Sequence, residues 1–222
     1  MKSNVYFVTG IDTDIGKTFA TGFLAKLWND QGQKTITQKL IQTGNIQISE
    51  DILVHRKLMQ IGLLAEDLEK WTMPIVLSYP ASPHLAAKLE NKTIKVEQIY
   101  AATSYLSEKY DAVLLEGAGG LMVPLTEDFL TIDYIQQHNF PVVLVTSGRL
   151  GSINHTLLSL NLLQQRGINL FALAYNTYHD SDNEIITYET IGYLKKFIQK
   201  NFPQAQWINI PNFLMEDEND KK

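Results

Sequence analysis

The chain has 222 residues, of which 45% are hydrophobic, and this is enough apolar material for one sizeable core. Its formal net charge of -5 argues against a nucleic-acid partner, because phosphate backbones attract basic surfaces. It contains no cysteine, which excludes disulfides, thiolate nucleophiles and cysteine-ligated zinc.

Neither a targeting segment nor a membrane span is apparent in the sequence. The apolar run near the amino terminus is short, and Asp12 and Asp14 follow it at once. No stretch reaches the roughly 20 apolar residues that cross a bilayer. We therefore expect a cytoplasmic protein without membrane association, and the lack of cysteine suits a reducing compartment.

Short β-rich runs alternate with longer helical patterns along the chain. Strands are predicted over residues 5–9, 34–41, 74–77, 112–115, 141–146, 170–175 and 207–210. Helices are predicted over residues 17–30, 50–61, 83–90, 96–108, 152–165 and 183–201. This alternation predicts an α/β fold with a mostly parallel central sheet and helices on both faces. We expect one domain over residues 1–213 and a flexible charged tail over 214–222.

Polar segments follow five of the predicted strands. They cover residues 10–18, 39–43, 116–120, 146–152 and 176–177. Ligands of parallel sheets bind at the carboxyl ends of the strands. We therefore expect one edge of the sheet to bring all five segments together.

The strongest single signal is GIDTDIGKT at residues 10–18, between a predicted strand and a predicted helix. Such a loop points backbone N–H groups at phosphate oxygens, and the helix adds the positive end of its dipole. Lys17 would neutralise the β- and γ-phosphates, and the Thr18 hydroxyl could bind Mg²⁺. Five residues separate Gly10 from Gly16, where the common pattern has four. The loop alone does not separate ATP from GTP, and a chance strand–turn–helix is the alternative.

Two carboxylates are candidates for the metal. Glu116 ends an apolar strand, and Asp51 starts a helix after the second strand; with Thr18 they could form a site of three oxygen ligands for Mg²⁺. Glu116 could instead be a turn residue, and Asp51 could be a helix cap. Three glycines within residues 117–120 favour a ligand that approaches the backbone closely.

Taken together, five segments resemble dethiobiotin synthetase, an ATP-dependent carboxylase of biotin biosynthesis. They are GIDTDIGKT (10–18), KLIQTG (39–44), PASPH (80–84), EGAGG (116–120) and LGSINH (150–155), and the resemblance runs from residue 5 to about 213. It implies a P-loop NTPase-like domain that uses ATP and Mg²⁺. It also implies that CO2 and 7,8-diaminononanoate form a carbamate, which ATP phosphorylates before the second amine closes the ring of dethiobiotin, releasing ADP and phosphate.

The resemblance also assigns roles to residues. It makes Lys39 and Lys17 catalytic, although spacing alone favours an exposed strand-end lysine at position 39. It makes Thr18, Asp51 and Glu116 ligands of magnesium and Thr43 a substrate contact. The nucleotide-binding residues that it implies are Asp12, Thr13, Asp14, Ile15, Gly16, Lys17, Thr18, Asp51, Glu116, Gly117, Ala118, Gly119, Asn176, Thr177, Ile210, Pro211 and Asn212.

The segment Gly151, Ser152, Ile153 and Asn154 opens a predicted helix. In the family that this chain resembles, this helix start binds the substrate's carboxylate and belongs to the neighbouring subunit, so the resemblance implies a homodimer. Backbone N–H groups and the helix dipole would face the anion.

Other functions remain open at this stage. The main alternative is a nucleotide-switched partition or positioning ATPase of the same phosphate-loop group. An ATP-dependent amidating enzyme is disfavoured, because such enzymes usually carry a glutamine-hydrolysing domain with its own cysteine. His55 and His138 have no partners at metal-ligand spacing, so we interpret them as surface or satisfied histidines.

Overall fold

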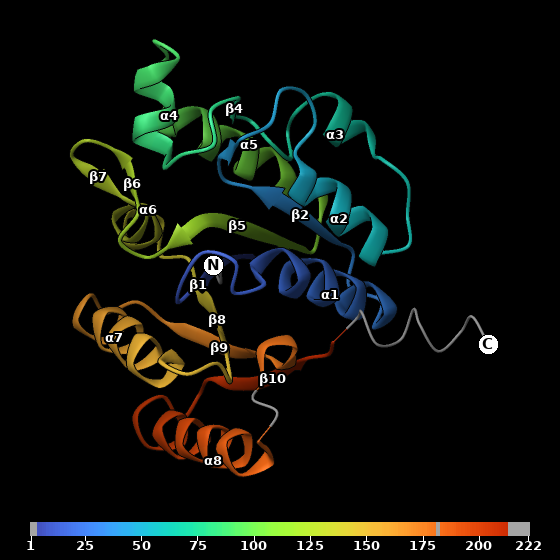
Figure 1. The fold of residues 1–222 in the computed structure, drawn as a ribbon. Coiled ribbons are helices and arrows are strands. Elements are labelled where there is room, and N and C mark those ends of the chain that lie inside the picture. Colours follow the sequence, from blue (N-terminus) through green and yellow to red (C-terminus); the bar gives the residue numbers. More distant parts are fainter. Residues whose placement is uncertain (1–3, 181–182, 213–222) are drawn as a thin grey trace.

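The computed structural model describes residues 4–180 and 183–212, and its centre is a six-stranded sheet in the order β10-β9-β8-β1-β5-β2 (Figure 1). The strands are β1 (Val5–Gly10), β2 (Thr35–Lys39), β5 (Ala112–Gly120), β8 (Val142–Ser147), β9 (Leu170–Asn176) and β10 (Gln206–Ile210). Every neighbouring pair in this sheet is parallel. The predicted parallel sheet is therefore confirmed, and the polar segments that follow its strands share one edge.

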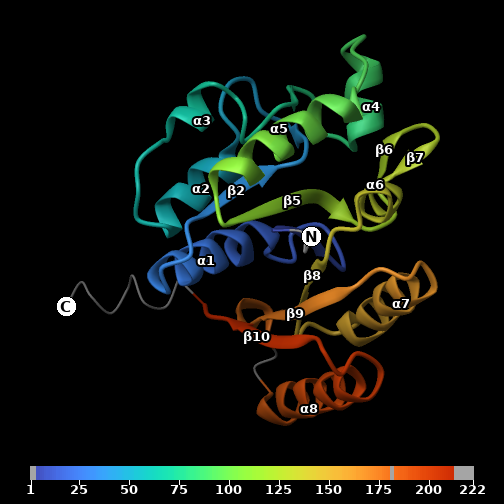
Figure 2. The ribbon, with the colours of Figure 1, turned by 180° about the vertical axis from the view of Figure 1, so that it is seen from behind.

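Helices cover both faces of the sheet, as the two opposite views show (Figure 1 and Figure 2). They are α1 (Lys17–Asp30), α2 (Glu50–Leu58), α3 (Ala65–Leu68), α4 (Pro83–Leu89), α5 (Val96–Lys109), α6 (Thr131–His138), α7 (Ser152–Gln165) and α8 (Glu184–Asn201), with a 3-10 turn, η1 (Thr177–His179). One face packs against α1, whereas α5, α6, α7 and α8 contribute to the core on the other face.

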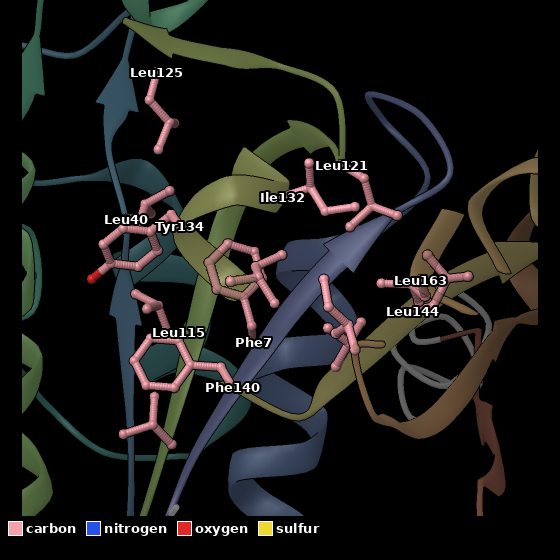
Figure 3. Close-up of a cluster of buried hydrophobic side chains, with 14 of the residues drawn as sticks. Phe7, Leu40, Leu115, Leu121, Leu125, Ile132, Tyr134, Phe140, Leu144 and Leu163 are labelled. Atoms are coloured by element: carbon pink, nitrogen blue, oxygen red, sulfur yellow. The ribbon is translucent and has the colours of Figure 1, made fainter. Parts of the chain in front are cut away.

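Alternation along the strands divides the core into two clusters. Leu114 packs in the cluster with α1, while its neighbours Val113 and Leu115 pack in the opposite cluster. This follows from the period of two along a strand. Figure 3 shows part of the cluster on the face opposite α1, where Phe7 and Leu115 lie near Tyr134 of α6. Burying one such side chain contributes about 1.5–3 kcal/mol, so the sheet is a firm support for the loops at its edge.

Several boundaries differ from those predicted. Strand β5 continues past Leu115 to Gly120, because it keeps pairing with β1, although the register shifts between Val8 and Gly10. The predicted strand over 34–41 stops at Lys39, and a short β3 (Gln42–Thr43) then pairs with β4 (Val76–Leu77) in a separate sheet. The helix predicted over 50–61 ends at Leu58, where the chain turns through a left-handed residue, Gln60.

Several elements were not predicted at all. They are the short helix α3, the hairpin of β6 (Pro124–Thr126) and β7 (Phe129–Leu130), the helix α6 that follows it, and the 3-10 turn η1. The predicted charged tail over 214–222 lies outside the described residues. Within the described parts of the chain, no helix is both long and apolar enough to span a bilayer.

Candidate active site

The phosphate loop joins β1 to α1, and its last glycine has a conformation that other residues rarely adopt. Gly16 is the N-cap of α1 with φ 94°, in the left-handed region. A Cβ at this position would lie 2.2 Å from Nδ2 of Asn176. Asn176 is buried, and its Nδ2 donates to the carbonyl of Ile15 at 2.9 Å. The side chain that follows β9 therefore braces the phosphate loop, and glycine leaves room for it.

Lys17 and Lys39 are both buried, although lysines are mostly exposed. The Lys17 ammonium donates to the carbonyl of Asp12 at 2.9 Å. Burial lowers the pKa of Lys17 below its ordinary value, and the nearby Glu116 opposes this effect only in part. The Asp12 carboxylate in turn pairs with Arg149, which lies in the loop after β8. This contact links two of the five polar segments across the sheet edge.

Lys39 stands between two carboxylates at the end of β2. Its Nζ lies 2.5 Å from Oδ2 of Asp51 and 2.7 Å from Oε1 of Glu116. Burial alone would lower the pKa of Lys39, but Glu116 and Asp51 raise it, and the net shift is upward. Burial alone would raise the pKa of Glu116, but the Lys39 ammonium and a hydrogen bond from His55 hold it well below its usual range. Both groups are therefore charged near neutral pH. The expectation of an exposed strand-end lysine, which spacing alone favoured, is wrong.

Thr18 completes the group of oxygen atoms. Its Oγ1 lies 3.0 Å from Oδ1 of Asp51 and 3.2 Å from Oε1 of Glu116. Ser49, rather than Asp51, caps α2, since its Oγ accepts from the backbone N–H of Ile52. The Asp51 carboxylate is therefore not used as a helix cap. Glu116 lies within β5 and is not a turn residue.

These three oxygen-bearing side chains fit a hard divalent cation. The Lys39 ammonium already lies between the two carboxylates, so the position is complementary to positive charge. Among the described residues, no group of three or more His, Cys, Asp or Glu side chains could hold a metal alone. A site with two carboxylates and one hydroxyl is typical of Mg²⁺, which usually takes its other ligands from water and phosphate oxygens.

His55 is a member of the site that the sequence did not reveal. Its side chain is fully buried, and its Nε2 lies 2.8 Å from Oε2 of Glu116. Of the two interpretations given for His55, a surface or a satisfied histidine, the structure agrees with the second, because α2 turns this residue inward to Glu116. One signal was present, since Asp51 and His55 are four residues apart and so share a face of the helix.

A cavity of about 760 Å³ opens beside these groups. Its lining includes Lys17, Thr18, Lys39, Asp51 and Glu116. The other lining residues are Thr13, Asp14, Gly16, Phe19, Ile41, Gln42, Thr43, Pro80, Ala81, Ser82, Pro83, Ala118, Gly119 and Val123. The cavity therefore combines two lysine ammonium groups with apolar side chains such as Ile41 and Val123, which suits an anion attached to an aliphatic chain.

The remaining candidates lie elsewhere. Asp12, Ile15 and Gly117 do not line the cavity, and neither do the residues at the ends of β9 and β10, namely Asn176, Thr177, Ile210, Pro211 and Asn212. The last group is held together, because Thr177 Oγ1 donates to the carbonyl of Ile210 at 3.1 Å. Gly151, Ser152, Ile153 and Asn154 are also outside the cavity, at the start of α7, where Gly151 has φ 92°.

Comparison with known proteins places the chain in a family. Residues 4–201 match a family model described as AAA domain, so the chain belongs to that family. The described fold is also similar to solved structures of the signal recognition particle receptor FtsY. One is from Elizabethkingia anophelis, with a TM-score of 0.52, 16% identity, and 97% of this chain and 62% of the receptor covered. Another is chloroplast FtsY from Physcomitrella patens, with a TM-score of 0.54 and 14% identity, and the match covers 96% of this chain and 60% of the receptor. At these identities the likeness shows the fold alone.

Curated relatives are much more similar in sequence. The ATP-dependent dethiobiotin synthetase BioD 2 of Pasteurella multocida is 54% identical, and the match covers 91% of this chain and 95% of the relative. The protein of the same name from Haemophilus influenzae is 57% identical over 80% of this chain and 93% of the relative. The ATP-dependent dethiobiotin synthetase BioD of Chlorobaculum tepidum is 50% identical, and the match covers 83% of this chain and 77% of the relative. The chain therefore belongs to the ATP-dependent dethiobiotin synthetases, a family of ATP-dependent ligases.

Proposed function

We propose that this protein carboxylates 7,8-diaminononanoate with CO2 at the expense of ATP and closes the ring of dethiobiotin. The observation that carries the proposal is the convergence of Lys17, Lys39, Thr18, Asp51 and Glu116 on one cavity. The cavity is also partly apolar, as an aliphatic diamine requires. The names of the relatives, which are ATP-dependent dethiobiotin synthetases, support the same substrate.

The proposed reaction has three steps. One amine nitrogen attacks CO2 and loses a proton, which gives a carbamate. A carbamate oxygen attacks the γ-phosphorus of ATP, and the bond to the β–γ bridging oxygen breaks to release ADP. The second amine then attacks the carbon of this carbamic–phosphoric anhydride and loses a proton. The carbon–oxygen bond breaks, phosphate leaves, and the cyclic urea is complete.

The second step brings two anions together, the carbamate and the γ-phosphate of ATP. The positive charges of the two lysines would offset their repulsion. Lys17, at the start of α1, would bind the β- and γ-phosphates, while Lys39 would face the carbamate. Lys39 is suited to this role, because its side chain lines the same cavity as Lys17 and Thr18. Thr43 lines the same cavity, and its hydroxyl would contact the substrate.

Thr18, Asp51 and Glu116 would hold Mg²⁺ beside the phosphates. When bound, this cation would neutralise charge on the transferring phosphoryl group. Because Lys39 lies between the same carboxylates, it would have to leave this position when the metal binds, and it would then be free to approach the carbamate. The residues of the loop at 12–18 and the glycine-rich segment of Glu116, Gly117, Ala118 and Gly119 would surround the nucleotide.

The adenine base would lie at the ends of β9 and β10. Asn176, Thr177, Ile210, Pro211 and Asn212 are grouped there, outside the cavity that holds the lysines. Asn176 also contacts the phosphate loop through Ile15, so a base at this position would lie beside the phosphates.

The substrate's carboxylate tail would be bound by a second copy of the chain. Gly151, Ser152, Ile153 and Asn154 begin the 14-residue helix α7, so their backbone N–H groups are suited to an anion. They do not line the cavity of their own chain, so the proposed contact would be made across a homodimer interface.

One assay tests the proposed reaction directly. The protein is incubated with ATP, Mg²⁺, labelled bicarbonate and 7,8-diaminononanoate, and acid-stable labelled product is measured. We expect label in dethiobiotin, with one ADP formed for each ring closed. ATP turnover that ignores the diamine would contradict the proposal and favour a nucleotide-switched ATPase. Lys39→Met should abolish ring closure while nucleotide affinity is kept, whereas the control Lys26→Met, at a partly exposed lysine outside the cavity, should behave like the wild type.

A further inference from the structure

We infer that His55 is a positioning residue that orients Glu116 toward the metal. Its Nε2–H holds one oxygen of the Glu116 carboxylate, so that the other oxygen faces Thr18 and the cation position. The inference rests on the proposed role of Glu116 as a magnesium ligand, and it goes beyond that role by adding a residue that would not itself touch metal, nucleotide or substrate.

The two oxygen atoms of Glu116 have different partners. Oε1 lies 2.7 Å from Nζ of Lys39 and 3.2 Å from Oγ1 of Thr18. Oε2 lies 2.8 Å from Nε2 of His55. The final torsion of a glutamate side chain is broad and has no sharp staggered preference, so the carboxylate needs contacts on both oxygens to keep one orientation. His55 provides the contact on the side away from the cation.

The hydrogen-bond roles follow from charge. Glu116 forms an ion pair with the Lys39 ammonium at 2.7 Å, and the ionised carboxylate of such a pair only accepts hydrogen bonds. Nε2 of His55 must therefore carry the proton that it shares with Oε2. Nδ1 of His55 is buried and makes no hydrogen bond to any described residue. Leaving a buried polar atom unpaired is unfavourable, and an apolar side chain would fill the same space without this cost. A histidine at this position is thus explained by its contact with Glu116.

Helix packing fixes the imidazole in place. Asp51 and His55 are separated by one turn of α2, so a single helix supplies one carboxylate and the support for the other. A Cβ added to Gly22 of α1 would lie 3.2 Å from the Cα of His55 and 2.7 Å from Leu58. The close approach of α1 and α2 therefore depends on this glycine. Because α1 begins at Lys17 and Thr18, the packing also sets His55 relative to the phosphate loop.

The test compares nucleotide affinity with and without Mg²⁺. A fluorescent methylanthraniloyl analogue of ATP is titrated into each variant in EDTA and in a series of Mg²⁺ concentrations, and the ratio of the affinities gives the metal enhancement. In His55→Leu we expect this enhancement to fall about 10- to 100-fold, which is typical for loss of an outer partner of a metal ligand. The affinity in EDTA should stay near the wild-type value. His55→Gln should keep most of the enhancement, since its Nε2 can reach Glu116, and His55→Asn should lose it, since its side chain is shorter.

His138 provides a matched control. It is a partly buried histidine on α6 that stacks on Tyr100 with ring centroids 4.2 Å apart. His138→Leu should leave the metal enhancement unchanged, and thermal unfolding checks that each variant is folded. If His55→Leu does not fold, the comparison of His55→Gln with His55→Asn decides the question.

Three outcomes would overturn the inference. In the first, His55→Leu and His55→Asn keep the wild-type enhancement. In the second, affinity falls equally in EDTA and in Mg²⁺, which would mean that the histidine only supports the fold. In the third, the wild type itself shows no enhancement by Mg²⁺. That result would remove the proposed metal site as well, and it is distinguishable from the other two because it appears without any mutation.

Discussion

Replacing Lys39 with methionine tests the charge balance of the site without removing the stem of the side chain. In the wild type the Lys39 ammonium lies 2.5 Å from Asp51 and 2.7 Å from Glu116. Glu116 is fully buried, so Lys39→Met leaves a buried carboxylate with Thr18 and His55 as its remaining partners. Breaking a buried ion pair by removing one partner costs about 3–5 kcal/mol.

The expected effect on unfolding is large and depends on conditions. For a chain of this size, about 2–4 °C is lost for each kcal/mol, so the midpoint of thermal unfolding in EDTA should fall by about 6–20 °C. Mg²⁺ should restore part of this loss, because it can take the place of the ammonium between the carboxylates. At ten times its dissociation constant it would add about 1.4 kcal/mol, and the wild type should respond less, since Lys39 competes for the position.

The pH dependence of this loss has a definite sign. Without the ammonium, burial raises the pKa of Glu116, so the carboxylate takes up a proton more readily as pH falls. The deficit of Lys39→Met relative to the wild type should therefore shrink toward acidic pH. Lys26→Met removes a partly exposed lysine paired with the exposed Asp30 and should lower the free energy of unfolding by less than about 1 kcal/mol. A Lys39→Met variant that is as stable as this control in EDTA, or whose midpoint does not respond to Mg²⁺, would refute the reasoning.

Two further substitutions test other parts of the fold. Gly16→Ala would place a Cβ 2.2 Å from Asn176 at φ 94°, so it should weaken nucleotide binding in a fluorescence titration. The control is Gly32→Ala, where φ is 85° but the space is open, so that backbone strain alone lowers the free energy of unfolding by about 1–2 kcal/mol. Gly16→Ala should lower it by about twice as much, and equal losses in the two variants would contradict the clash. Arg56→Met would leave the buried Asp67 without the guanidinium that donates to it at 2.7 and 2.8 Å, and urea unfolding at pH 7 should show a loss of about 3–5 kcal/mol. Burial would raise the pKa of Asp67, but Arg56 lowers it overall, so in the wild type this contribution is present above the unfolded pKa and is lost as acid protonates the carboxyl; an acid unfolding profile that is the same in Arg56→Met would contradict it.

Much of the fold was predictable because its signals are local. The apolar run of β1, the glycine turn and the start of α1 at Lys17 are contiguous in sequence, and the predicted helix over 17–30 is confirmed. The helix α6 was missed, because its eight residues are too few to show a clear period. Its start depends on Asp133, whose carboxylate accepts from the backbone N–H of Leu130 at 3.0 Å.

The site residues at the ends of strands could be predicted from the sequence, whereas those placed by helix packing could not. Glu116 follows the apolar run of β5, Lys39 ends the neighbouring strand β2, and the two residues are paired in register in the sheet. The contact of His55 with Glu116 joins residues that are 61 positions apart and depends on how α2 rotates against the sheet. No spacing in the sequence encodes that rotation. Likewise, Ser49 rather than Asp51 caps α2, which becomes clear only when the side chains are placed.

The hydrogen bond from Asn176 to Ile15 connects β9, the second strand from one edge of the sheet, to the glycine-containing turn between β1 and α1. A ligand that displaces the end of β9 would also displace that turn, because the Asn176 amide donates directly to the Ile15 carbonyl. With the base placed at Asn176 as proposed above, a substitution of Asn176 that changes which base binds would also change the phosphate loop. We therefore expect such a substitution to alter turnover as well as nucleotide selectivity.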